Sequence, residues 1–226
     1  AVGANDAQAA TELVEYYEPR GMYAELANML EIIFNSYEAG EERSACGLRL
    51  AKLFETKLAD DASAYAWYLK IVTEDIHYTE AYDGLERTAG KTGNAQVVVD
   101  LFRKHLETSD DAMFSRELQY RIGCMLLEYL NGADEAQKIF ESLLAEDPED
   151  VRALGALERI LEREGRFQEL YEVNERRMAL AKTDADRAET LLSGARIKEH
   201  HLDNKEGAIE NYEQVCELLP EDTRPL

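Results

Sequence analysis

The chain has 226 residues and a net charge of −22, and 45% of its residues are hydrophobic and 32% charged. This apolar content is enough for a packed core and too high for a disordered chain. A strongly negative field repels phosphate backbones and anionic lipid headgroups, so we expect neither nucleic acid nor a membrane surface as a partner. Only four prolines and thirteen glycines interrupt a sequence rich in Ala, Leu and Glu, which predicts an all-α protein.

The sequence repeats itself with a spacing of 72 residues. The matching columns are Ala9, Ala81 and Ala153; Leu13, Leu85 and Leu157; Gly21, Gly93 and Gly165; Leu26, Val98 and Leu170; Leu58, Leu130 and Leu202; Ala64, Ala136 and Ala208; Tyr68, Phe140 and Tyr212; and Ile71, Leu143 and Val215. Self-similarity at a fixed period is the signature of stacked helical or other supersecondary units. We therefore expect three double units, 1–76, 77–148 and 149–220, with two helix pairs in each and about twelve helices in all.

Residue types predict where the helices end. Gly21, Gly93 and Gly165 are expected between the two helices of the first pair in each unit, where the backbone needs a positive φ. Asp60, the Asn131-Gly132 step and Asp203-Asn204 are expected to do the same in the second pairs. Between pairs, the segments 147–150 and 219–222 each contain Pro-Glu-Asp, which predicts the end of one helix and an acidic cap for the next.

Several of these positions resemble the tetratricopeptide repeat (TPR) family, whose repeat is about 34 residues long. In residues 151–184 the family pattern is matched by Leu154, Leu157, Leu161, Gly165, Phe167 and Leu170. The second-helix pattern is matched by Ala136, Phe140 and Pro148, and again by Ala208, Tyr212 and Pro220. The resemblance covers residues from about 6 to 220 and implies a right-handed α-solenoid of about six TPR-like antiparallel helix pairs, a single domain similar to bacterial TPR-like arrays.

The chain departs from the family pattern on the first helix of each pair. The usual tryptophan is absent from the first pairs, and Glu86 and Glu158 stand where the family has a small residue. In the second pairs, Ala51, Gly123 and Ala195 are expected to provide the small contact.

The resemblance also implies a function. First helices of successive pairs in such families line a concave surface that holds a peptide or a partner helix, so we expect a protein-interaction scaffold or adaptor with no enzyme activity. Helical spacing projects a set of mostly cationic residues onto this predicted surface. The candidate partner-binding residues are Arg87, Lys91, Tyr120, Arg152, Arg159, Arg163 and Arg196.

Two hypotheses account for these cations. Forked guanidinium donors suit carboxylates, so Arg87, Lys91, Arg159 and Arg163 are candidates to hold an acidic peptide or a C-terminal carboxylate. Alternatively the arginines pair within their own helices, Arg87 with Asp83 and Arg159 with Glu162.

Catalytic and metal-binding hypotheses find little support. His200 and His201 are adjacent, and neighbouring positions on a helix point about 100° apart, which does not suit one metal ion. The three cysteines, Cys46, Cys124 and Cys216, form no CxxC motif and are expected to be buried or reduced thiols. The chain has no nucleotide-binding or zinc-protease motif. We expect no cofactor, no metal and no catalytic residue.

Other functions stay open at this point: a self-assembling structural element, and with it a homo-oligomer, a regulatory helical domain of a larger enzyme, or an enzyme with an unrecognised site. The chain lacks an initiator methionine and ends close to a repeat boundary, so we expect a fragment of a longer protein. The compartment is left open, with the cytoplasm slightly favoured.

Overall fold

A computed structural model describes residues 4–220, and within them it contains helices and no strand. The twelve α-helices are α1 (Ala4–Tyr17), α2 (Tyr23–Ser36), α3 (Glu41–Leu53), α4 (Asp61–Glu74), α5 (Tyr82–Thr92), α6 (Ala95–Leu106), α7 (Ala112–Tyr129), α8 (Ala133–Glu146), α9 (Val151–Glu164), α10 (Phe167–Ala179), α11 (Asp184–His200) and α12 (Lys205–Leu218). Three short helical turns join them, η1 (Glu18–Arg20), η2 (Phe54–Leu58) and η3 (Thr79–Ala81). The predicted all-α solenoid of helix pairs is confirmed.

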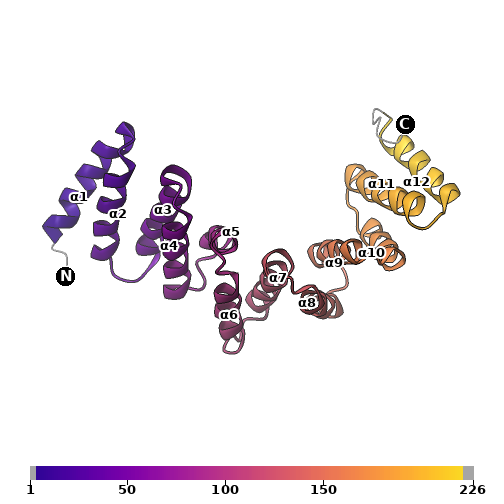
Figure 1. Cartoon of the computed structure of the whole chain (residues 1–226), viewed down its shortest axis with the longest axis horizontal. Helices are drawn as coiled ribbons and strands as arrows, with labels where there is room; N and C mark the ends of the chain where they lie inside the picture. The colour runs from indigo at the N-terminus through magenta and orange to yellow at the C-terminus, as the bar shows by residue number, and fades with distance from the viewer. Residues whose placement is uncertain (1–3, 221–226) are drawn as a thin grey trace. The chain divides into compact units, whose positions relative to one another are not determined.

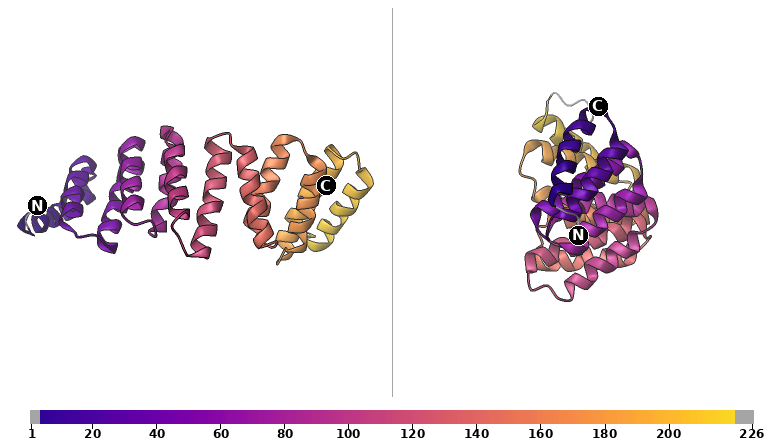
Figure 2. Two further views of the ribbon diagram at one scale, coloured as in Figure 1. Left: turned by 90° about the horizontal axis from the view of Figure 1, so that it is seen from below. Right: turned by 90° about the vertical axis from the view of Figure 1, so that its left-hand side faces the viewer.

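The helices pack as two compact units, one ending at Thr108 and the next beginning at Ser109. The first holds the pairs α1–α2, α3–α4 and α5–α6, and the second holds α7–α8, α9–α10 and α11–α12 (Figure 1). Within each unit the successive pairs lie side by side, as Figure 2 shows in its left view. The division falls between α6 and α7, inside the expected unit 77–148. The single domain and the boundaries of the three double units remain predictions.

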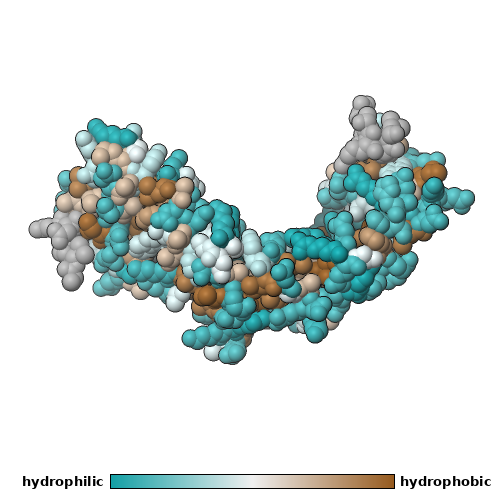
Figure 3. All heavy atoms as spheres, in the orientation of Figure 1, coloured by the Kyte–Doolittle hydropathy of each residue, from teal (hydrophilic) through white to brown (hydrophobic). Residues whose placement is uncertain are grey.

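Each unit has its own apolar core, because one helix pair cannot bury its hydrophobic face alone. In the first unit the core includes Leu26, Phe34, Leu50, Tyr68 and Val98, and in the second it includes Leu118, Phe140, Leu154, Ile160 and Leu192. Charged side chains occupy the opposite faces of the helices. Hydrophilic residues accordingly cover most of the surface visible in Figure 3.

The helix ends follow the sequence signals with one correction. Gly21, Gly93 and Gly165 have φ values of 68°, 74° and 69°, as predicted for the turns of the first pairs. In the second pairs the positive φ occurs at Ala59, Asn131 and Asp203. The prediction for Asp60 is therefore wrong: α3 runs on through the π-helical turn η2, so the chain reverses at Ala59. Asp60 is instead the N-cap of α4, and its carboxylate accepts a hydrogen bond from the Ser63 amide at 3.0 Å.

Asp150 acts as the predicted acidic cap, since its carboxylate accepts hydrogen bonds from the amides of Arg152 and Ala153 at the start of α9. The corresponding Asp222 lies outside the described residues. The expected small contacts are also present. Ala51 and Ala195 are fully buried, and a Cβ added to Gly123 would lie 2.6 Å from the ring of Phe140.

Candidate functional site

The predicted partner-binding residues are divided between the two units. Arg87 and Lys91 lie on α5 in the first unit. Tyr120 lies on α7 in the second unit, together with the three arginines of α9 and Arg196 of α11. Each group is described below within its own unit.

In the first unit, the half-exposed Arg87 side chain binds the buried carboxylate of Glu55. Its Nε and Nη2 donate to the two carboxylate oxygens of Glu55 at 2.6 and 3.0 Å, and the Tyr68 hydroxyl donates to the same carboxylate at 2.9 Å. The Arg87 guanidinium holds the pKa of Glu55 below its ordinary value, although burial acts in the opposite direction. Lys91 forms an ion pair with Asp61 at 2.8 Å. Both cations therefore connect α5 to the preceding helix pair.

In the second unit, the α9 arginines make contacts of the same kind. Arg159 pairs with Glu128 at 3.0 Å and Arg152 with Glu117 at 2.9 Å, and both carboxylates belong to α7. Arg163 donates to the Leu127 carbonyl near the end of α7 at 3.1 Å, where a cation is favoured by the helix dipole.

Neither hypothesis from the sequence describes these cations fully. They are already paired with carboxylates or a carbonyl, and these acceptors lie outside their own helices, apart from the Asp83 carbonyl, to which Arg87 also donates at 3.3 Å. The side-chain acceptors of Arg87, Lys91 and Arg159 stand 30 to 32 residues earlier in the chain, about one repeat. A search for opposite charges at that spacing would have found them.

Tyr120 is half-buried against the core of its own pair. Its ring makes an edge contact with Phe140 at 5.8 Å between centroids, and the Arg152 guanidinium lies over it at 4.4 Å. Burial raises the pKa of Tyr120 to about 12. The Tyr120 ring thus holds the Arg152 guanidinium by a cation–π contact.

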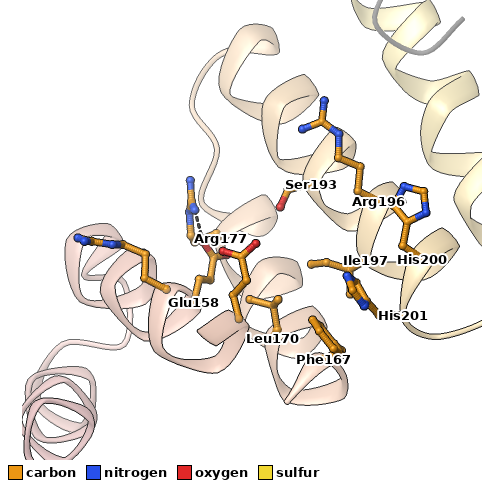
Figure 4. A pocket seen from close by; sticks show the side chains of 12 residues that line it. Glu158, Phe167, Leu170, Arg177, Ser193, Arg196, Ile197, His200 and His201 are labelled. Carbon is orange, nitrogen blue, oxygen red and sulfur yellow. Dashed lines mark hydrogen bonds and ion pairs between the residues drawn. The ribbon is translucent and has the colours of Figure 1, made fainter. Parts of the chain in front are cut away.

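A pocket of about 520 Å³ lies between α9, α10 and α11 in the second unit. Two predicted residues, Arg159 and Arg196, line it. Its apolar part is formed by Phe167, Leu170 and Ile197 (Figure 4). The first helices of two successive pairs, α9 and α11, therefore border one cavity that combines apolar side chains with cations.

Arg196 differs from the other arginines of this pocket. Among the described residues it has no hydrogen bond or ion pair, whereas Arg159 is bound to Glu128 and Arg177 to Glu158. Figure 4 shows its side chain extending from α11, on the same helix as Ile197. Arg196 is exposed to solvent, so its guanidinium is available to a ligand.

The pocket also contains a buried carboxylate that the sequence did not identify as part of a site. The Glu158 side chain is 12% exposed, and burial raises its pKa, although Arg177 and the nearby Asn174 amide act against this. Within the described part of the chain, Glu158 Oε1 and Asn174 Nδ2 each lack a well-aligned hydrogen bond. The available signal was a charged residue at a position where the repeat normally has a small one.

His201 takes a packing role. The His201 ring stacks on Phe167 with 3.6 Å between centroids and 9° between planes, at the edge of the pocket. Among residues 4–220, no group of three His, Cys, Asp or Glu side chains is arranged to hold a metal ion. In the same range no helix has the length and apolar character needed to span a bilayer.

No protein-family model matches this sequence, and neither does any curated protein. Solved structures do resemble it. The C-terminal part of a TPR repeat-containing protein from Cytophaga hutchinsonii has a TM-score of 0.66 and 16% identity, covering 97% of this chain and 86% of that one. PilW, a type IV pilus biogenesis factor, has a TM-score of 0.59 and 16% identity, covering 96% and 95%.

PilF from Pseudomonas aeruginosa has a TM-score of 0.51 and 16% identity, covering 96% of this chain and 94% of that one. At such identities the likeness establishes the fold alone. It agrees with the arrangement of helix pairs described above. The chain therefore has the fold of a tetratricopeptide-like helical array.

Proposed function

We propose that this chain is a protein-interaction scaffold that binds a segment of a partner protein along the first helices of its pairs, and that it carries out no chemistry of its own. The pocket between α9, α10 and α11 carries the proposal. Repeat arrays use extended surfaces of this kind for binding, and recognition needs apolar anchors with a few placed polar groups.

The contacts narrow the predicted set of binding residues. Arg87, Lys91, Arg159 and Arg163 are engaged within the protein, so an incoming carboxylate would have to compete with groups already in place. Arg196 has no such competitor among the described residues and lies beside apolar Ile197. The ligand that fits best is a partner segment with an apolar side chain close to a carboxylate, either an acidic residue or a free C-terminus.

A peptide-binding measurement tests this proposal. The probe is a fluorescent peptide library whose members end in Leu, Ile or Phe with a free carboxylate, alongside the same peptides carrying a C-terminal amide. Binding is followed by fluorescence anisotropy. A charge-assisted hydrogen bond contributes about 1.5–3 kcal/mol, so Arg196→Glu should weaken the carboxylate peptides by about 10- to 100-fold.

The matched control is Lys138→Glu, which makes the same charge change at an exposed position of α8, outside the pocket. This control variant should lower the affinity for the peptides only through the change in net charge of the protein, and that loss should disappear at high salt. Equal losses for the two variants, or equal binding of acid and amide peptides, would show that Arg196 does not read a carboxylate.

A further inference from the structure

The junction between the second and third helix pairs shows which side chains hold one helix pair against the next. Tyr68 on α4 and Glu55 on η2 are joined by a hydrogen bond of 2.9 Å. Two residues of helix α5, three positions apart in the sequence, pack against Tyr68 and Glu55. Gly84 lies so close to Tyr68 that an added Cβ would stand 2.2 Å from its ring, and Arg87 donates two hydrogen bonds to Glu55.

The same tyrosine–glutamate contact recurs at the last described helix pair. Glu199 and Tyr212 stand two repeat lengths after Glu55 and Tyr68, and the Tyr212 hydroxyl donates to Glu199 at the same distance of 2.9 Å. Within residues 4–220 no arginine or lysine pairs with Glu199, whose other partner is the His200 ring at 3.8 Å.

Exposure shows that this second copy of the contact is uncovered. The Glu199 side chain is 42% exposed, whereas that of Glu55 is 8% exposed. Tyr212 is half-buried, whereas Tyr68 is 1% exposed. Two further side chains of α12 continue the patch: Cys216 is half-buried, and Ile209 is 55% exposed.

We propose that Glu199, Ile209, Tyr212 and Cys216, called here the α12 surface, are a docking site for the first helix of a further helix pair. That helix carries a small residue facing Tyr212 and, three residues later, an arginine facing Glu199. The chain uses this spacing twice. Gly84 and Arg87 have it on α5, and Ala156 and Arg159, which pairs with Glu128, have it on α9.

Charge complementarity argues against a second copy of this chain as the occupant. In α1 the positions of Gly84 and Arg87 are taken by Glu12 and Glu15, both exposed. Head-to-tail stacking of two copies would bring these carboxylates towards Glu199 and place a glutamate side chain against Tyr212. Like charges in that position repel, so the occupant has to supply the arginine from another helix.

The test supplies the occupant covalently, so that concentration does not limit binding. Residues 1–220 are followed directly by a second copy of residues 77–108, which continues the 72-residue register. The control carries residues 5–36 instead, whose first helix has Glu12 and Glu15 at the two positions. Hydrogen exchange of the α12 amides is measured in both proteins and in the unextended chain.

The expected result is at least tenfold slower exchange of α12 with the 77–108 extension and little change with the 5–36 extension. Replacing the arginine of the extension with Gln, or Glu199→Gln, should each remove most of that protection, and the two together should add little more. In the unextended chain Glu199→Gln should change the exchange of the α12 amides far less, because the glutamine amide oxygen can still accept from the Tyr212 hydroxyl.

Three outcomes would overturn the proposal. The first is equal protection by both extensions. The second is self-association of the unextended chain that depends on Glu199, measured by sedimentation, because the occupant would then be a second copy. The third is faster exchange of the α12 amides in the unextended chain on Arg224→Ala, because the chain itself would then supply the arginine.

Discussion

The close approach of α5 to Tyr68 allows a quantitative prediction for Gly84→Ala. The new Cβ would stand 2.2 Å from the Tyr68 ring, about 1.2 Å short of the 3.4 Å at which ordinary contact begins. Tyr68 is 1% exposed and held by Glu55, so the ring has little freedom to move. Overpacking costs about 1–3 kcal/mol and displacement of the tyrosine endangers a hydrogen bond of about 1.5–3 kcal/mol, while alanine gains about 1 kcal/mol in helix propensity.

The net expectation is a loss of about 2–4 kcal/mol, which lowers the thermal midpoint of the first unit by on the order of 10 °C. Circular dichroism and calorimetry measure it. The control is Gly155→Ala on α9, where an added Cβ meets nothing within 4 Å, so the variant should gain about 0.5–1 kcal/mol. An unchanged or raised midpoint for Gly84→Ala would refute the argument from close packing.

Three further predictions concern single side chains. Because burial raises the pKa of Glu158, the folded second unit binds this proton more tightly than the unfolded chain does. The contribution of Glu158 to the stability of the unit should therefore fall as pH rises above about 4.5, and urea titrations at several pH values should show this contribution disappear in Glu158→Gln. Asp150→Ala should cost about 1–2 kcal/mol in urea denaturation, while Asp150→Asn should retain most of the cap and lose only the ion pair with Arg116 at 3.1 Å. Cys46, buried and with its pKa raised to about 11, should react with Ellman's reagent near neutral pH far more slowly than the two half-buried thiols, and equal rates would contradict its burial.

The sequence predicts the fold because its pattern is periodic and local. Glycine at a helix end and alanine at a crossing point are required by backbone geometry, and Gly93 and Ala195 appear where the register places them. Ala59 could not be foreseen in the same way. Its positive φ follows from the π-helical turn before it, and nothing in the residue type indicates that turn.

The site was less predictable because partner choice depends on how neighbouring pairs are rotated against each other. Arg87 and Arg159 lie on the first helices of their pairs, but helical spacing in the sequence offered partners only within those helices. Glu55 and Glu128 belong to the preceding helix pair, so these ion pairs depend on how the two helix pairs pack. The stacking of His201 on Phe167 likewise joins residues of different pairs.

The inter-pair ion contacts bear on how the chain folds. Since Arg87, Lys91 and Arg159 reach acceptors only 30 to 32 residues away, their native contacts close short loops, which favours rapid folding from any adjacent pairs. The charges are also partly exposed and so are screened by salt. Ionic strength should therefore help to determine how many neighbouring helix pairs unfold together. The unfolding transition should be broader and less cooperative in concentrated salt than in dilute buffer.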